Sequence, residues 1–131
     1  MSSIFSKIIA GEIPCYKIAE NEEFFAFLDI NPVAKGHTLV VPKEEVDYIF
    51  DIDNEQLGRM IFFAKRVAAA QREVLPCKRI GITVMGLEVP HAHIHLIPMN
   101  SEKDMNFSAE KFSLSKEEFT EISEEIQKKF R

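Results

Sequence analysis

Apolar residues recur with two different periods along this chain, and the change of period separates expected helices from expected strands. Near the start, helical spacing, in which positions three and four apart share a face, relates Ile4, Phe5, Ile8 and Ile9. Gly11 follows this stripe, and glycine commonly ends helices because it adopts the left-handed conformation. The first residues therefore predict a short amphipathic helix.

Two later stretches share the helical period. The longer one begins after Asp53, which with Gln56 resembles a capping box, and Pro76 stops it. The other begins at Ser115, which forms a capping box with Glu118. The apolar stripes are Leu57, Met60, Ile61, Ala64, Val67, Ala68, Val74 and Leu75 in the first and Phe119, Ile122, Ile126 and Phe130 in the second. The pattern predicts a long helix and a C-terminal helix, each with one buried face.

Runs rich in β-branched and aromatic residues predict about five strands, at residues 15–19, 24–29, 36–42, 80–84 and 91–98. We expect the last two to pair in antiparallel fashion because the connection between them is short, and we expect Pro98 to end the last one. The strands cluster apart from the long helices. The sequence therefore predicts an α+β domain, with an antiparallel sheet of about five strands, one long helix, a short N-terminal helix and a C-terminal helix.

Three of the four histidines occupy alternate positions in the last predicted strand, at His91, His93 and His95. Strand geometry places them on one face and the apolar residues between them on the other, toward the core. An imidazole titrates near pH 6.5, so each ring can donate, accept or carry a proton near neutral pH. The spacing suits a nucleophilic imidazole flanked by two rings that hold an anion, or a zinc site with an open position.

Two more polar residues lie at strand ends. His37 is in the third predicted strand, and a neighbouring strand would bring it beside the three alternating histidines. Asp29 ends the second predicted strand beside an Asn-Pro turn, where aspartate is most often a turn former. Its carboxylate could also accept hydrogen bonds from a hydroxyl of a ligand.

Composition narrows the classes of function. A chain of 131 residues is expected to form one domain with a sizeable core, and its net charge of −5 argues against a protein that coats a nucleic-acid backbone. No apolar run is long enough to span a bilayer, and no leader pattern opens the chain, so we expect no membrane partner and no export. Cys15 and Cys77 form no Cys-x-x-Cys pair, which favours reduced thiols in a cytosolic, cytoplasmic protein.

The alternation His-apolar-His-apolar-His followed by two apolar residues, at 91–97, resembles the signature of the histidine triad (HIT) superfamily. Residues 4–14, 27–30 and 36–42 resemble three further segments of that family, in the family order. The resemblance covers Ser3 to about Met99. It implies a single HIT-like domain over residues 1–131, with a core at 3–99 and a C-terminal extension with a helix at 100–131.

The resemblance implies cleavage at the α-phosphate of a nucleoside phosphoramidate or dinucleoside polyphosphate, through a nucleotidyl-histidine intermediate, with release of a nucleoside monophosphate. His93 would be the nucleophile, and His91 and His37 would belong to the polar network that orients it. His95 would contact the phosphate, and Asp29 would bind ribose hydroxyls. The residues implied to line the base pocket are Ile4, Phe5, Ile8, Ile13, Phe27 and Ile30. A purine-type nucleotide as substrate, no cofactor or metal, and a homodimer that joins two five-stranded sheets are also implied.

The loop before the first histidine of the triad departs from the family pattern. Many members carry Asn-x-Gly-x-x-Gly-Gln-x-Val-x-His there, whereas this chain has a shorter loop in which Leu87 replaces the glutamine. Glu88 replaces a small hydroxyl residue, and Met99 stands where many relatives have arginine. These changes remove polar partners of a phosphate and add a carboxylate. Two alternatives stay open: a nucleotide-binding or interaction protein with weak turnover on the same fold, and a metal site built from the four histidines.

Overall fold

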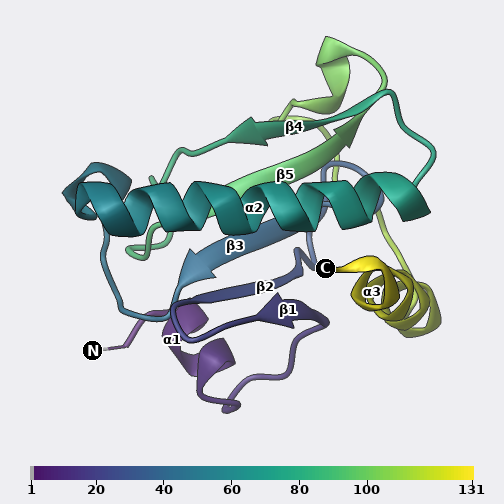
Figure 1. The fold of residues 1–131 in the computed structure, drawn as a ribbon. Helices are drawn as coiled ribbons and strands as arrows, with labels where there is room; N and C mark the ends of the chain where they lie inside the picture. The colour runs from purple at the N-terminus through teal and green to yellow at the C-terminus, as the bar shows by residue number, and fades with distance from the viewer. Residues whose placement is uncertain (1) are drawn as a thin grey trace.

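The computed structural model describes residues 2–131 and shows an open antiparallel sheet of five strands in the order β1-β2-β3-β5-β4 (Figure 1). The strands are β1 Lys17–Glu20, β2 Phe24–Leu28, β3 Thr38–Pro42, β4 Arg79–Thr83 and β5 Ile94–Met99. Every neighbouring pair is antiparallel, including β4 and β5, as the short connection between them predicts. The α+β fold class is confirmed.

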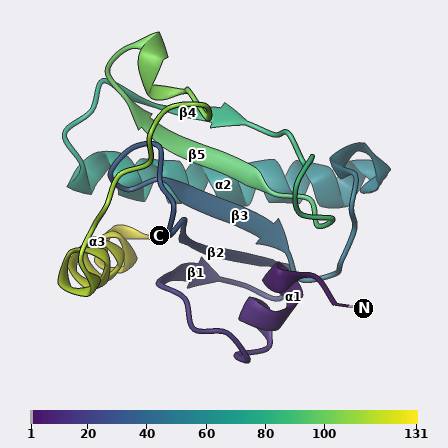
Figure 2. The same ribbon diagram turned by 180° about the vertical axis from the view of Figure 1, so that it is seen from behind.

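Three helices and two short 3-10 turns complete the chain. The helices are α1 Ile4–Ile9, α2 Asn54–Val74 and α3 Lys116–Lys129, and the turns are η1 Ile49–Asp51 and η2 Glu102–Asp104. Helix α2 lies across one face of the sheet, and the view from behind shows the other face of the sheet in front of it (Figures 1 and 2). Helix α3 packs against α2 and the β1 edge. No helix within residues 2–131 is long and apolar enough to cross a membrane.

Helix α2 starts where the sequence predicts, because the Asp53 side chain accepts a hydrogen bond from the backbone N–H of Gln56. The predicted stripe lies on or against the core, with one exception. Ile61 is 46% exposed, whereas Phe63, absent from the stripe, is 1% exposed. Both residues are apolar, so hydrophobicity alone could not decide which of them the sheet would cover. Gln71 is also fully buried on this face.

Strand β5 differs from its predicted bounds at both ends. It runs through Pro98 to Met99, because β3 ends its pairing opposite Leu96 and leaves β4 as the neighbour at Pro98. A proline is tolerated at such a local edge, where its missing N–H faces no partner strand. At the other end, His91 and His93 precede the strand, and the backbone N–H of Ala92 bonds to a loop carbonyl instead.

The predicted division of the two sheet faces nevertheless holds. Ala92, Ile94 and Leu96 belong to the main core between the sheet and α2. On the opposite face, the Phe5 ring of α1 packs with its edge against the His93 ring, at 4.9 Å between centroids. The histidines therefore lie on the side of the sheet away from α2, and α1 is the helix that contacts them there.

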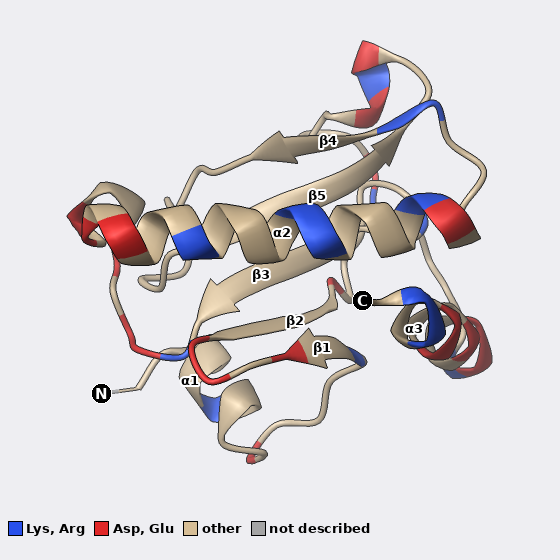
Figure 3. Ribbon diagram, viewed as in Figure 1, with Lys and Arg blue, Asp and Glu red and all other residues tan. Residues whose placement is uncertain are grey.

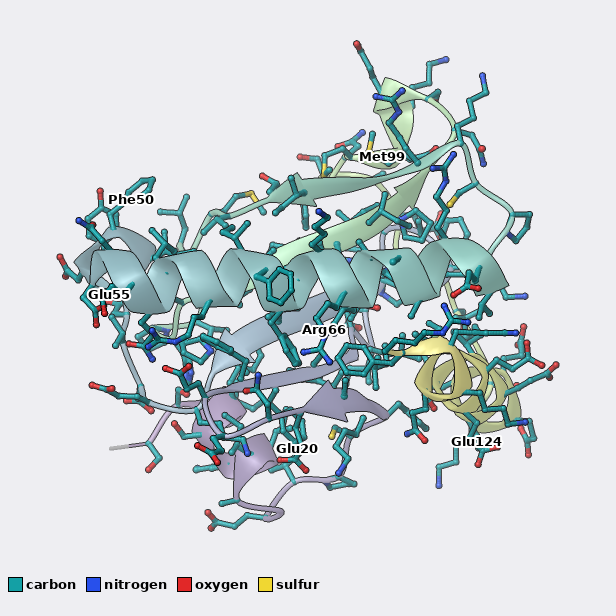
Figure 4. All side chains as sticks on the ribbon, in the orientation of Figure 1. Glu20, Phe50, Glu55, Arg66, Met99 and Glu124 are labelled. Atoms are coloured by element: carbon teal, nitrogen blue, oxygen red, sulfur yellow. The ribbon has the colours of Figure 1, made fainter. Side chains whose placement is uncertain are left out.

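The C-terminal helix also follows its predicted pattern. Ser115 and Glu118 form the expected capping box, and Phe119 and Ile122 are buried against the core. Acidic residues, in red, occupy much of α3 (Figure 3). Glu124 projects from this helix into solvent, and Phe50 is exposed beside the first turn of α2 (Figure 4). Helix α3 carries five glutamates and three lysines.

Candidate functional site

The four histidines come from two neighbouring strands and the segment that leads into one of them. His37 directly precedes β3, and His95 lies in β5 opposite Leu39 of β3. This pairing brings the two rings together, with His37 Nε2 3.0 Å from His95 Nδ1. His91 and His93 enter from the loop before β5, and all four side chains are buried. The structure thus places His37 beside the triad, as the strand order allows.

The backbone carbonyl of His91 determines which ring nitrogen of His93 carries the proton. Its Nδ1 lies 2.7 Å from the carbonyl oxygen of His91, and because a carbonyl only accepts, Nδ1 must carry the proton. Nε2 therefore keeps its lone pair, on a side chain that lines a cavity. Burial is the largest influence on the ring and lowers the pKa of His93 below its usual 6.5, which favours the neutral form. The arrangement prepares a neutral imidazole nucleophile.

A second chain of hydrogen bonds fixes His37 and His95. The backbone N–H of Val33 donates to His37 Nδ1, at 3.2 Å, so the proton of His37 resides on Nε2. That Nε2–H donates to His95 Nδ1, which leaves the Nε2–H of His95 free as a donor. Burial lowers the pKa of His37 to about 3 and that of His95 to about 4, so both rings are neutral at pH 7. His95 can therefore donate a hydrogen bond to an anion.

The remaining histidine, His91, is anchored by residues that the sequence analysis did not identify. Its Nε2–H donates to the carbonyl of Pro42, at 2.8 Å, so its Nδ1 accepts a hydrogen bond from the Ser3 hydroxyl, at 2.7 Å. Glu45 accepts in turn from the backbone N–H of Ser3 and from the hydroxyl of Ser6. No local motif marks these contacts, because 88 residues separate Ser3 from His91 in sequence.

A cavity of about 570 Å³ lies on the histidine side of the sheet. His93 and His95 line it, whereas His37 and His91 support them from behind. All the residues expected around a base are among its lining: Ile4, Phe5, Ile8, Ile13, Phe27 and Ile30. Aliphatic and aromatic side chains thus form one part of the wall, and imidazoles form another. Such a cavity suits a ligand with a flat apolar end and a polar end.

Asp29 also lines this cavity, immediately after β2. One carboxylate oxygen accepts the backbone N–H of Asn31, as a turn-forming aspartate does, and the other lies 3.6 Å from His37 Nε2. Burial raises the pKa of Asp29, with the Asn31 hydrogen bond opposing that rise. Asp29 therefore both forms the turn and presents an acceptor to a ligand.

The loop that departs from the family pattern forms another part of the cavity wall. Leu87 is 91% exposed and offers no polar contact. Glu88 lines the same cavity as His93, and its charge raises the pKa of His93, against the larger lowering caused by burial. The carboxylate therefore lies close enough to His93 to influence the charge of its ring.

The segment after β5 also reaches the site, which sequence reasoning did not predict. The Phe107 ring packs with its edge against His95, at 4.9 Å between centroids, and lies 6.0 Å from His37. Ser108 and Lys111 line the cavity next to it. Residues 100–113 show no hydrophobic period, so their path over the histidines left no signal in the sequence.

The side chains that could hold a metal are not the four predicted histidines. Within residues 2–131, the group whose ligand atoms converge, all within 4.8 Å, is Asp29, His37 and His95. The Val33 N–H, however, keeps the proton of His37 on Nε2, the nitrogen that faces the other two ligands. A metal ion would have to displace that proton and break the bond to His95. The donor set therefore fits a hydrogen-bonded relay better than a metal centre.

Comparisons with known proteins identify a family model, relatives and solved structures that resemble this chain. The family model described as "HIT domain" matches residues 10–102. The chain is 35% identical, over 100% of both chains, to the adenosine 5'-monophosphoramidase of Schizosaccharomyces pombe. It superposes on the Hit-like protein from Bartonella henselae with a TM-score of 0.82 and 30% identity, covering 97% of this chain and 95% of that one. For the zinc-bound histidine triad family protein from Mycobacterium smegmatis the TM-score is 0.85, the identity 28% and the coverage 99% and 94%.

Proposed function

The chain belongs to the HIT domain family, and on that premise we propose that it hydrolyses purine nucleoside phosphoramidates to release a nucleoside monophosphate. The observation that carries the proposal is the neutral His93, whose Nε2 lone pair is free on the cavity wall. The relative of full length named as an adenosine 5'-monophosphoramidase supports the choice of substrate class. Dinucleoside polyphosphates, which also present an α-phosphate, are the second substrate class.

In the proposed reaction, His93 Nε2 attacks the α-phosphorus, the P–N bond breaks, and the departing amine takes a proton from solvent. The new N–P bond leaves a positive charge on the ring, which the hydrogen bond from Nδ1–H to the His91 carbonyl stabilises. The Nε2–H of His95 donates to a phosphate oxygen and stabilises the charge that develops there. Water then attacks phosphorus, the N–P bond breaks, and His93 is regenerated.

The rest of the cavity suits the remaining parts of a nucleotide. The aliphatic and aromatic wall of α1 and β2 would hold the base, and Asp29 would accept hydrogen bonds from the ribose hydroxyls. The proposed reaction needs no metal, because hydrogen bonds already set the tautomers of the histidines that act in it. The cytosol remains the proposed location, and it suits the two cysteines, which are free thiols.

A nucleotide-binding protein with feeble turnover is the second candidate, and Glu88 favours it. A carboxylate on the wall of the cavity would repel an anionic phosphate. Exposed Leu87, in place of a polar residue, supplies no compensating donor. The two candidates differ in whether the enzyme turns over, since both bind a nucleotide.

The test is release of AMP from adenosine 5'-monophosphoramidate by the wild-type protein and by His93→Ala. We expect the substitution to lower kcat by at least about 1,000-fold, or about 4 kcal/mol, while AMP still binds. Wild-type protein quenched during turnover should carry a nucleotidyl adduct on His93 by mass spectrometry. His93→Ala turnover near that of the wild type would refute the assignment of the nucleophile.

The same assay in EDTA separates the hydrolase from a metal enzyme. We expect full activity after chelation, because the donor and the nucleophile are imidazoles already fixed by hydrogen bonds. Activity lost on chelation and restored by zinc would instead favour the metal site. A wild-type protein that binds AMP without releasing it from the substrate would favour the binding protein.

We also propose that two copies of the chain form a homodimer through the β4 edge of the sheet. Strand β4 lies at one end of the strand order, and Ile82 on it is 53% exposed. An unpaired edge with exposed apolar side chains is the kind of surface that proteins cover.

A further inference from the structure

The charges around the cavity do not match a phosphate unless Lys111 takes part. Two carboxylates line the cavity, Asp29 and Glu88, and both repel an anion. His93 and His95 are neutral at pH 7, because burial lowers the pKa of each. Among the described residues that line the cavity, Lys111 is the sole lysine or arginine. Any attraction that a full positive charge gives to a nucleotide phosphate must therefore come from this ammonium.

Lys111 is held at the cavity by its own loop. Its Nζ donates to the backbone carbonyl of Phe107 and, at 3.3 Å, to that of Ala109. An ammonium has three N–H donors, so one remains for a ligand. The same loop carries the Phe107 ring that packs on His95. The ammonium is thus fixed relative to the histidine that faces the phosphate in the proposed reaction.

The electrostatic influence of Lys111 also points into the site. Its positive charge lowers the pKa of Asp29 and contributes to the lowering of the pKa of His37. Because Asp29 lines the cavity, the ammonium lies near the part of the cavity wall that carries Asp29. Residue 111 also lies beyond residues 10–102, which the family model matches.

We propose that Lys111 is a substrate-binding residue whose ammonium contacts the phosphate of the bound nucleotide and offsets the repulsion from Glu88. The inference rests on the proposed function, because it assumes that a nucleotide occupies the cavity. It makes the C-terminal extension part of the binding site.

The test compares binding of AMP with binding of adenosine, which lacks the phosphate, by isothermal titration calorimetry. Lys111→Met keeps the length of the side chain and removes its charge. We expect it to weaken AMP binding about 5-fold or more and to leave adenosine binding within about 2-fold. The AMP effect should shrink in high salt, since the cavity is open to solvent. Lys111→Arg, which restores a cation, should recover most of the AMP affinity.

Lys103→Met is the matched control, because Lys103 is an exposed lysine of the same extension in η2 and lies outside the cavity lining. Equal weakening of AMP and adenosine by Lys111→Met would overturn the inference, because it would show that the residue acts through Asp29 or through loop structure. Unchanged AMP binding would overturn it as well. In both of these outcomes the wild-type protein still binds AMP, so the inference fails alone. A wild-type protein that does not bind AMP would overturn the proposed function together with the inference.

Discussion

The His91 imidazole is held at both nitrogens by residues from two distant parts of the chain. Its Nε2–H donates to the carbonyl of Pro42, and its Nδ1 accepts from the hydroxyl of Ser3. The same Ser3 oxygen accepts the backbone N–H of Ser6 and so caps α1. One hydroxyl therefore begins a helix and also orients the residue whose backbone carbonyl sets the tautomer of His93.

Replacing Ser3 with alanine should destabilise the protein by more than the loss of an ordinary helix cap. Loss of a cap costs about 1 kcal/mol. The buried Nδ1 of His91 would lose its donor as well, which adds about 1–3 kcal/mol. We therefore expect Ser3→Ala to lower the free energy of unfolding in urea by about 2–4 kcal/mol.

Ser115→Ala is the matched control, because Ser115 caps α3 through the N–H of Glu118 at an exposed position. We expect it to lose only the cap, about 1 kcal/mol. Ser3→Thr keeps the hydroxyl and should stay close to the wild type. Equal losses from the two alanine variants would mean that the Ser3 hydroxyl contributes nothing through His91.

Helix α2 contacts both segments that carry His37 and His95 through one buried side chain. Its sequence contains no motif that predicts a part in the site. The buried Gln71 of α2 donates from its side-chain amide to the carbonyls of Gly36, at 3.0 Å, and of Leu96, at 3.1 Å. Gly36 precedes His37 at the start of β3, and Leu96 follows His95 in β5. A single side chain on the far face of the sheet thus helps to set the spacing of the two histidine strands.

At Gly36 the end of α2 packs so closely on the backbone that there is no room for a side chain. Its φ is +91°, in the left-handed region, and a Cβ atom there would lie 2.1 Å from Cδ1 of Leu75 at the end of α2. Gly36→Ala should therefore lower the free energy of unfolding by about 2 kcal/mol or more, from backbone strain and overpacking together. Urea denaturation followed by circular dichroism would measure the loss.

Gly58→Ala provides the opposite control, because Gly58 lies within α2 and a Cβ there meets nothing within 4 Å. We expect this variant to stabilise the protein by about 0.5–1 kcal/mol, since alanine favours a helix over glycine. A Gly36→Ala variant as stable as the wild type would contradict the close approach of α2 to the start of β3.

Sequence periodicity predicted those elements whose polar and apolar faces differ clearly. Helix α3 shows this, with its capping box at Ser115 and its buried Phe119 where the pattern predicts them. The pattern failed where two apolar residues compete for one face, as Ile61 and Phe63 do in α2. It also failed at Pro98, because the length of the neighbouring strand β3 decides whether a proline there is at an edge.

In the candidate site, too, the sequence predicted positions set by local strand geometry but not contacts between residues far apart in the chain. The alternating histidines predicted the face that carries His93 and His95, because strand geometry is local. The partners of His91 could not be predicted, since Ser3 contacts it only through the fold. Phe107 and Lys111 lie in a segment without hydrophobic periodicity, so no pattern predicted that they would line the cavity.

At the scale of the whole molecule, the two edges of the sheet differ in whether a helix packs against them. At one edge, β1 is packed against α3. At the other edge lies β4, on which Ile82 is exposed (Figure 1). An uncovered edge strand with apolar side chains can pair with a second copy of itself through a two-fold axis. The homodimer that we propose therefore uses β4 rather than β1.

We accordingly expect static light scattering at micromolar concentration to report twice the chain mass of 15.0 kDa, or about 30 kDa. Ile82→Lys should convert the protein to a monomer, because a lysine on an edge strand opposes edge-to-edge pairing. Phe112→Lys is the control, since Phe112 is a comparably exposed apolar residue in the C-terminal extension, away from β4. A wild-type protein that scatters as a monomer, or an Ile82→Lys variant that remains dimeric, would exclude β4 as the contact between copies.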